Sequence, residues 1–389
     1  MIRTRINFIW LISIVSLCLV ATNQSPQEWA IVGAGPAGIC VIGVLLDLGI
    51  PEKNISWIDP EFNVGRLGQH YQNVPANTQN RMFIHFLNSC KIFCKCDSPS
   101  MTYLYNLDPD KEYELKTIVE PLKDITDYLC TQVVTHTCSM TSLDYKNGLW
   151  NIGLQDNSYV RAKNVILATG SRPRVLNYEC NTIIPLDIAL DRFLLEKHIQ
   201  ENDSIAVIGG AHSAILILKF LSEMNVARIL NFYTKPLEYS VEVAPDVTPM
   251  PNGLSGIAAR WAYHVLDKDT PPNILRIRST DLSRKAWLPI CNKIIYACGY
   301  DRNDLPVING SAAQELQYNS SNGTIAPHIW GIGIAFPETT TYPDGYIEYK
   351  IGLNDFMDYA QTMIPFWMKK KEPFKRFISF EKLFTIVRL

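Results

Sequence analysis

The fold is decided by the stretch Glu28-Trp-Ala-Ile-Val-Gly33-Ala-Gly35-Pro-Ala-Gly38. An apolar strand runs into three glycines with the spacing GxGxxG, and an apolar helix is expected over 39–48. Gly33 permits a tight turn, Gly35 lets the backbone approach a pyrophosphate, and Gly38 lets the helix pack closely on the strand. The free N–H groups and the dipole at the start of such a helix favour phosphate. The stretch therefore predicts a dinucleotide site built from Gly33, Gly35, Pro36, Ala37 and Gly38.

A second strand, expected over 55–58, ends in Asp59, which lies 21 residues beyond Gly38. An acid at this distance accepts hydrogen bonds from the ribose hydroxyl groups of an adenosine. Glycine-rich turns are common, so a chance turn beside a surface aspartate is the alternative. The order of strand, glycine turn, helix, strand and acid favours the dinucleotide site over that alternative.

A similar arrangement recurs at Ser204-Ile-Ala-Val-Ile-Gly209-Gly-Ala-His-Ser-Ala214, where a β-branched strand leads into a second glycine turn. Two dinucleotide folds in one chain imply two dinucleotides, and the natural pair is FAD with NAD(P). The match is imperfect because Ala211 replaces the middle glycine, and its methyl group would cost roughly 1–3 kcal/mol in a tight contact. A domain that holds its nicotinamide cofactor poorly or not at all is therefore the alternative. The predicted contacts of this turn are Gly209, His212, Ser213 and Ala214.

The strand after that helix, expected over 227–233, is followed by Thr234-Lys235 without an acid. An acid there would select NAD by binding the 2′-hydroxyl group, so its absence beside a lysine favours NADP. Lys235 is the candidate ligand of the 2′-phosphate. A solvated surface lysine is the alternative.

The segment between the two turns has the alternation of a β-meander and leads to a buried strand that ends at Ala-Thr169-Gly170. Ala-Cys-Gly299-Tyr300 repeats this ending where the chain returns, and a last strand is expected over 329–335, with Gly333 in it. These endings would place backbone near the flavin nucleotide. We therefore expect an α/β protein with a doubly wound Rossmann-like FAD domain and an inserted NAD(P)-binding Rossmann-like domain. The expected boundaries are 28–175 for the first part of the FAD domain, 176–298 for the inserted domain, and 299–389 for the second part with the C-terminal helices.

Together these residues resemble the two-dinucleotide flavoproteins, the superfamily of pyridine nucleotide-disulfide oxidoreductases and class B flavin monooxygenases. The resemblance runs from about residue 28 to 350. The disulfide-reductase branch needs a redox cysteine pair spaced CxxC or CxxxxC, and the chain has neither spacing. The monooxygenase branch is more similar, because Asp59-Pro-Glu-Phe-Asn-Val-Gly65-Arg66 resembles its acid-plus-glycine loop. The resemblance implies that Gly65 and Arg66 contact FAD.

The segment Tyr71-Gln-Asn-Val-Pro-Ala-Asn77-Thr78-Gln-Asn-Arg-Met82 resembles a segment of the flavin-containing monooxygenases in which the asparagine of Asn-Thr lies beside the reactive C4a edge of the flavin. The resemblance implies that Asn77 is the catalytic residue and that Thr78 contacts the cofactor. The neutral amide of Asn77 would donate a hydrogen bond there and slow the loss of peroxide in a dry site. The alternative is a turn asparagine that caps a helix over 78–88.

The resemblance implies an FAD-dependent oxidoreductase whose flavin is reduced by NAD(P)H and which oxygenates an N or S centre of a small molecule. Some family features are missing: there is no FxGxxxH sequence before the second turn, and the last FAD-domain strand is followed by Phe336-Pro-Glu338. Two alternatives stay open. One is a reductase or oxidase that passes electrons to another acceptor, and the other is an FAD-binding protein with a decayed nicotinamide site.

Composition narrows the class of partner. The chain has 389 residues and a net charge of −2, which argues against nucleic acid and favours a small-molecule substrate. Ten cysteines, three of them at 90, 94 and 96, are expected to be structural thiols or a disulfide rather than a zinc site, so we predict no metal. Oligomeric state is not predicted.

Residues 1–21 have the pattern of a secretory signal peptide, with Arg3 and Arg5 before an uncharged apolar run and small residues at Cys18 and Ala21. The run is short for a membrane span, so an uncleaved anchor is the less favoured alternative and no stable span is expected after cleavage. The predicted location is the secretory pathway. Glycosylation sequons agree with it, among them those that start at Asn54, Asn202, Asn309, Asn319 and Asn322.

Overall fold

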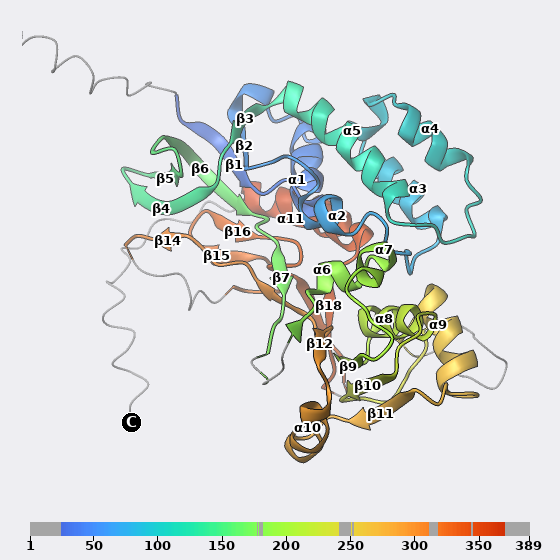
Figure 1. The fold of residues 1–389 in the computed structure, drawn as a ribbon. Helices are drawn as coiled ribbons and strands as arrows, with labels where there is room; N and C mark the ends of the chain where they lie inside the picture. The colour runs from blue at the N-terminus through green and yellow to red at the C-terminus, as the bar shows by residue number, and fades with distance from the viewer. Residues whose placement is uncertain are drawn as a thin grey trace, which may run out of the picture.

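The protein is built on two main β-sheets, a mixed sheet with a parallel centre and a second sheet that is parallel throughout, and helices pack against each of them (Figure 1). The computed structural model describes residues 25–176, 178, 182–240, 250, 253–310, 318–343 and 345–369. The predicted signal peptide, 1–21, lies outside these residues. None of the helices in the described ranges has the length and apolar character that crossing a membrane requires.

The first sheet has a five-stranded parallel centre that carries the first glycine turn. Its strands, in spatial order, are β3 (Val134–Thr137), β2 (Ile55–Asp59), β1 (Gln27–Val32), β6 (Tyr159–Leu167) and β16 (Ile329–Gly331). One core cluster packs this sheet against α1 (Pro36–Asp47), α5 (Lys116–Gln132) and α11 (Leu353–Lys369). Within it Trp330 stacks on Trp367 of α11 at 5.3 Å between ring centroids. The C-terminal helix is therefore part of the first domain's core.

An antiparallel meander extends the same sheet on its other side. The pairs β4 (Met140–Lys146) with β5 (Leu149–Leu154) and β5 with β6 are antiparallel. Because β6 is long, its first half pairs with β5 and its second half with β16. A second core cluster around Trp150, Ile152 and Phe336 lies under the meander. The small strands β14 (Val307–Ile308) and β15 (Thr324–Ala326) complete the sheet.

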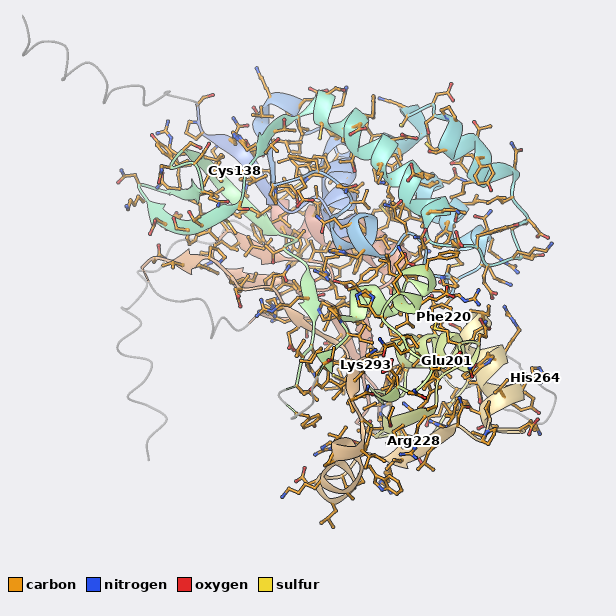
Figure 2. All side chains as sticks on the ribbon, in the orientation of Figure 1. Cys138, Glu201, Phe220, Arg228, His264 and Lys293 are labelled. Carbon is orange, nitrogen blue, oxygen red and sulfur yellow. The ribbon has the colours of Figure 1, made fainter. Side chains whose placement is uncertain are left out.

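The second sheet belongs to the inserted segment and is parallel throughout. Its order is β11 (Ile274–Arg278), β10 (Arg228–Tyr233), β9 (Ser204–Ile208), β12 (Lys293–Tyr296) and β8 (Thr182–Ile183). Arg228 and Lys293, labelled in Figure 2, are the first residues of β10 and β12 and mark the edge of this sheet where those strands begin. Its helices are α6 (Leu186–Ala189), α7 (Arg192–Glu196), α8 (His212–Ser222), α9 (Gly256–Trp261) and α10 (Asp281–Trp287).

Two short strands mark where the chain passes between the sheets. β7 (Ser171–Pro173) pairs antiparallel with β13 (Tyr300–Arg302), so the outgoing and returning segments lie side by side. The two sheets with their connection confirm the predicted fold class.

The remaining elements lie outside the two sheets. In the first domain they are α2 (Gly65–His70), α3 (Asn80–Asn88), α4 (Pro99–Asn106), the hairpin of β17 (Glu338–Thr341) and β18 (Ile347–Lys350), and the 3₁₀ turns Glu52–Asn54 and Phe93–Lys95. In the inserted segment they are a π-helical turn at Ala262–Leu266 and a 3₁₀ turn at Leu288–Ile290.

Two sequence expectations need correction. The strand expected over 329–335 ends at Gly331, and Gly333 lies in the turn after it. At Gly331 the Phe336 ring packs so closely that a Cβ would lie 2.3 Å from it. The helix expected over 78–88 begins at Asn80, and its N-cap is Gln79.

Candidate dinucleotide sites

The first glycine turn is too tight for any other residue at two positions. Gly33 has φ +109°, and a Cβ there would lie 2.2 Å from the Ala168 carbonyl oxygen. A Cβ on Gly38 would lie 1.9 Å from the Gly33 carbonyl oxygen. The Gly33 N–H donates to the Ile58 carbonyl at 2.8 Å, which fixes the turn between the parallel strands. The spacing of these glycines is therefore a steric requirement of the turn.

The start of α1 is open toward solvent, in contrast to the turn behind it. A Cβ on Gly35 would meet nothing within 4 Å, and no side chain caps the helix, which begins with Pro36 at its first position. Gly65 lies against Gly35, since its Cβ would be 3.1 Å from the Gly35 Cα. Gly333 lies against Ala37, with 2.6 Å from its Cβ position to the Ala37 Cβ. Three separate segments of the first domain thus meet at an uncapped helix start, an arrangement that fits a pyrophosphate.

Asp59 connects the glycine turn to the loop that follows β2. Its Oδ2 accepts a hydrogen bond from the Ala34 N–H at 2.7 Å, and its Oδ1 accepts from the N–H groups of Glu61 and Phe62 at 2.9 and 2.7 Å. A carboxylate has about four acceptor positions, so capacity for a ribose hydroxyl group remains. Asp59 therefore has a structural role beside the predicted ribose contact.

The end of β6 holds an unpaired hydroxyl group. The Thr169 Oγ1 is buried and has no hydrogen-bond partner among the described residues. The Asn303 side chain donates to the Thr169 carbonyl at 2.8 Å, and its N–H donates to the Gly170 carbonyl at 3.2 Å. A buried donor without a partner is costly, so a ligand atom here would satisfy it. Asn303 was missed by the sequence analysis because it lies 134 residues from Thr169.

The second glycine turn repeats the geometry of the first. Gly209 has φ +143°, its N–H donates to the Phe232 carbonyl at 2.9 Å, and a Cβ on it would lie 2.1 Å from the Ala297 carbonyl oxygen. Asn231 donates to the Gly209 carbonyl at 2.7 Å, as Trp57 donates to the Gly33 carbonyl at 3.0 Å. Ala214, in the third position, is buried. The backbone of a nucleotide-binding turn is therefore intact here.

Ala211 is the difference between the two turns. It is the N-cap of α8 with φ −99°, and Gly35 is the N-cap of α1 with φ −74°, so alanine causes no backbone strain at this position. The Ala211 side chain is exposed. Its methyl group therefore occupies the kind of space that Gly35 leaves open. Ser213 follows in the first turn of α8.

His212 faces a neighbouring segment of its own domain. Its Nε2 accepts a hydrogen bond from the Ser255 N–H at 2.8 Å, which assigns the neutral ring with its proton on Nδ1. Burial lowers the pKa of His212 from its usual value and favours the same neutral form.

Two basic residues lie near the second glycine turn: Lys235 follows β10 by two residues, and Arg276 is the middle residue of β11, beside β10. Lys235 is exposed, and its Nζ lies 5.2 Å from the centroid of the Tyr346 ring in the turn between β17 and β18. Arg276 lies over the Tyr233 ring at 4.5 Å and has a buried Nη2 without a hydrogen-bond partner in the described ranges. Arg276 was not predicted, because only the register of β11 beside β10 brings it here.

Asn77 lies at the contact between the two domains. It is exposed, its Oδ1 accepts from the Thr78 hydroxyl group at 3.2 Å, and its backbone carbonyl accepts from the Ser255 hydroxyl group at 3.1 Å. The capping alternative for Asn77 is wrong, because α3 is capped by Gln79 without a side-chain hydrogen bond. Among the described residues, the Asn77 amide nitrogen donates to no partner, so it remains available to a ligand.

Arg66 and Tyr300 come together through residues that were not predicted. The Tyr300 hydroxyl group donates to the Tyr71 hydroxyl group at 3.3 Å, and Tyr71 donates to the Asp187 Oδ1 at 2.6 Å. Arg66 forms an ion pair with the same carboxylate. Burial, together with the neighbouring Tyr300 and Asp187, raises the pKa of Tyr71 far above its usual value. Gly299, before Tyr300, has φ +99° and accepts from the Arg174 N–H at 2.9 Å.

The described part of the chain contains neither a disulfide nor a cluster of side chains arranged to bind a metal ion. All eight cysteines placed there are free, including those at 90, 94 and 96. Within the same residues, no group of three His, Cys, Asp or Glu side chains is arranged to hold a metal ion.

Comparison with known proteins identifies a curated relative and solved structures of similar fold. No family model matches the chain. The monooxygenase AgnR1 of Paecilomyces divaricatus is 29% identical over 396 residues, covering 89% of this chain and 99% of the relative. An ornithine N-hydroxylase of Kutzneria sp. 744, solved with reduced FAD, NADP⁺ and L-ornithine, has a TM-score of 0.59 at 14% identity, covering 89% of this chain and all of its own.

Two further solved structures come from both branches of the predicted superfamily. A flavin-containing monooxygenase from Stenotrophomonas maltophilia has a TM-score of 0.56 at 15% identity, covering 88% of this chain and 98% of its own. A bacillithiol disulfide reductase from Staphylococcus aureus has the same TM-score at 12% identity, covering 89% and 99%. The curated relative is named a monooxygenase, and the ornithine N-hydroxylase is the structure solved with FAD and NADP⁺. The chain has the fold of the two-dinucleotide flavin oxidoreductases, as its glycine turns predicted.

Proposed function

We propose that this protein is an FAD-dependent monooxygenase that uses NADPH to oxygenate a nitrogen or sulfur atom of a small molecule. The observation that carries the proposal is the meeting of Gly35, Gly65 and Gly333 around the open, uncapped start of α1. The similarity to a curated monooxygenase over nearly the whole chain supports the oxygenating branch. The net reaction is substrate, O₂, NADPH and H⁺ giving oxygenated substrate, water and NADP⁺.

The residues of the first domain would hold FAD. The start of α1 would bind the pyrophosphate, Asp59 the adenosine ribose, and Thr169 a polar atom of the cofactor through its unpaired hydroxyl group. Bound FAD supplies acceptance of a hydride from NADPH and activation of O₂. Asn77 would offer its free amide N–H to the reacting edge of the cofactor. A neutral donor is suited to this task because it does not add a charge to the site.

The second domain would hold NADPH. The turn at Gly209 supplies the backbone, the start of α8 supplies free N–H groups, and Lys235 would bind the 2′-phosphate. One observation favours a second candidate: the exposed Ala211 methyl group at the pyrophosphate position. A protein with FAD but a decayed nicotinamide site is that candidate.

Oxygen labelling tests the proposal. The protein, loaded with FAD, is supplied with NADPH and ¹⁸O₂ together with a panel of simple thioethers and amines. Mass spectrometry of the products is expected to show one ¹⁸O atom per oxidised molecule. NADPH consumption that yields only hydrogen peroxide across the panel would favour an oxidase, and no NADPH consumption would favour the decayed site.

We also propose that the protein enters the secretory pathway. The support is the apolar segment within 1–21 and its basic start. Expression of the full chain in eukaryotic cells, followed by N-terminal sequencing, tests this: a mature protein that begins near residue 22 is expected. A protein that keeps Met1 and stays outside the secretory compartments would contradict it.

A further inference from the structure

The backbone of Asn77 is held by the inserted domain as well as by its own. The Ser255 hydroxyl group donates to the Asn77 carbonyl oxygen at 3.1 Å. The next residue, Gly256, has φ +62° and lies so close that a Cβ would be 2.9 Å from the Asn77 Cα and 3.3 Å from its carbonyl carbon. One hydrogen bond and one steric contact therefore fix the same peptide from the side of the second domain.

A second contact holds the unit to which Asn77 belongs. The segments 74–80 and 111–115 are joined by backbone hydrogen bonds from Ala76 to Tyr113, Asn80 to Lys111 and Leu115 to Val74, at 2.8–2.9 Å. Glu112 of this unit accepts hydrogen bonds from Nη1 and Nη2 of Arg260, which lies in α9 four residues after Gly256. Helix α9 and the Ser255 that precedes it thus contact the Asn77 unit at two places.

Ser255 is itself fixed by the second nucleotide turn. Its backbone N–H donates to the His212 Nε2 at 2.8 Å, and its Oγ lies 3.0 Å from the same nitrogen. Since Nε2 already accepts the backbone N–H, the Ser255 hydroxyl proton is free to point to the Asn77 carbonyl. A continuous path of hydrogen bonds runs from the start of α8 to the peptide of Asn77.

We propose that Ser255 is a positioning residue that sets the place of the Asn77 amide at the flavin. This inference rests on the proposed function, because the proposed function places the Asn77 side chain at the reacting edge of the flavin. With the carbonyl of Asn77 held, its side chain has a fixed origin, and its amide N–H can meet the reacting atoms in one geometry. Without the Ser255 hydroxyl group the segment gains freedom, and the site becomes a poorer barrier to the loss of peroxide.

Three variants of the FAD-loaded full protein test the proposal. Ser255→Ala removes the hydroxyl group, and Ser255→Thr keeps it in an extended conformation (φ −131°) that threonine tolerates. Ser240→Ala is the matched control, because Ser240 donates to the Leu254 carbonyl at 3.1 Å within its own domain. Two quantities are measured. The first is the rate of amide hydrogen exchange in the peptide 72–82, and the second is the amount of hydrogen peroxide released per NADPH oxidised in the presence of a probe substrate that the enzyme oxygenates.

Ser255→Ala is expected to raise exchange in 72–82 about two- to tenfold, as loss of one hydrogen bond does, and to raise the peroxide fraction by a similar factor. Ser255→Thr and Ser240→Ala are expected to behave as wild type in both measurements. Equal exchange in Ser255→Ala and Ser240→Ala would overturn the inference, and so would faster exchange without extra peroxide. Failure of the proposed function would look different: the wild-type flavin would not be reduced by NADPH, while the exchange comparison would still decide whether Ser255 holds Asn77.

Discussion

Gly35 and Gly38 belong to the same turn, but the space available for a side chain differs between the two positions. A side chain at Gly35 would point into open space, whereas one at Gly38 would collide with the Gly33 carbonyl oxygen. The first position is thus reserved for a ligand and the second for the helix–strand contact. The two glycines are separable by mutation for this reason.

Gly35→Ala is expected to leave the stability of the cofactor-free protein within about 0.5 kcal/mol of wild type, as at an unhindered surface position, while weakening FAD binding. Gly38→Ala is expected to destabilise the cofactor-free protein by about 1–3 kcal/mol or more through overpacking. Urea unfolding of apoprotein and titration with FAD measure the two effects. If Gly35→Ala bound FAD as wild type does, the pyrophosphate would not lie at the start of α1.

Ala211→Gly is expected to tighten NADP⁺ binding roughly fivefold or more, because it removes a methyl group worth about 1–3 kcal/mol in a tight contact. Ala211→Ser, which keeps the Cβ, serves as the control and should give no such gain. Titration of the FAD-loaded protein with NADP⁺ measures both. Unchanged affinity in Ala211→Gly would mean that the pyrophosphate does not approach this residue.

At the scale of elements, the β17–β18 hairpin reaches from the first domain to the end of β10, where Tyr346 meets Lys235. Lys235→Ala is expected to lower the affinity for NADPH roughly tenfold, since hydrogen bonds to charged groups contribute about 1.5–3 kcal/mol, and to leave NADH affinity nearly unchanged. Binding titrations with both cofactors measure the ratio. An equal loss of affinity for NADPH and NADH would show that Lys235 does not bind the 2′-phosphate.

A buried ion pair joins the starts of β9 and β12. Lys293 donates to the Asp203 Oδ2 at 2.5 Å, and the Asp203 side chain is only 3% exposed. Burial alone would raise the pKa of Asp203, but hydrogen bonds from Lys293, Asn292 and the Gln200 N–H outweigh it and lower the pKa. Because the folded pKa lies below the unfolded one, this stabilisation is present above about pH 4 and is lost as the pH falls further.

Asp203→Asn is therefore expected to cost about 3–5 kcal/mol at pH 7, as loss of one partner of a buried pair does, with a smaller difference from wild type below pH 4. Asp281→Asn is the control, because Asp281 is 85% exposed and its pair with Arg284 should contribute under about 1 kcal/mol. Urea unfolding at several pH values measures both. A difference between wild type and Asp203→Asn that does not change with pH would contradict this account.

At the scale of the whole molecule, the features that could be predicted from the sequence are those that a short stretch of chain determines by its own geometry. The glycine turns, the acid after β2 and the returns at Thr169 and Gly299 each depend on a short stretch with fixed steric needs, so the two-domain fold followed from them. Ser255, Arg276 and Asn303 were missed because only tertiary packing brings them to the sites. The end of β16 was misplaced because Phe336, beyond the strand, packs over Gly331.

If the chain places two dinucleotides as proposed, electrons pass from NADPH to FAD within one protein. The most direct measurement is the visible spectrum of the purified protein lacking residues 1–21, under anaerobic conditions, before and after NADPH is added. We expect a flavin band that NADPH bleaches. A flavin band that NADPH leaves unchanged would contradict electron transfer from the second domain, and a protein that stays colourless after reconstitution with FAD would show that the chain does not bind this cofactor.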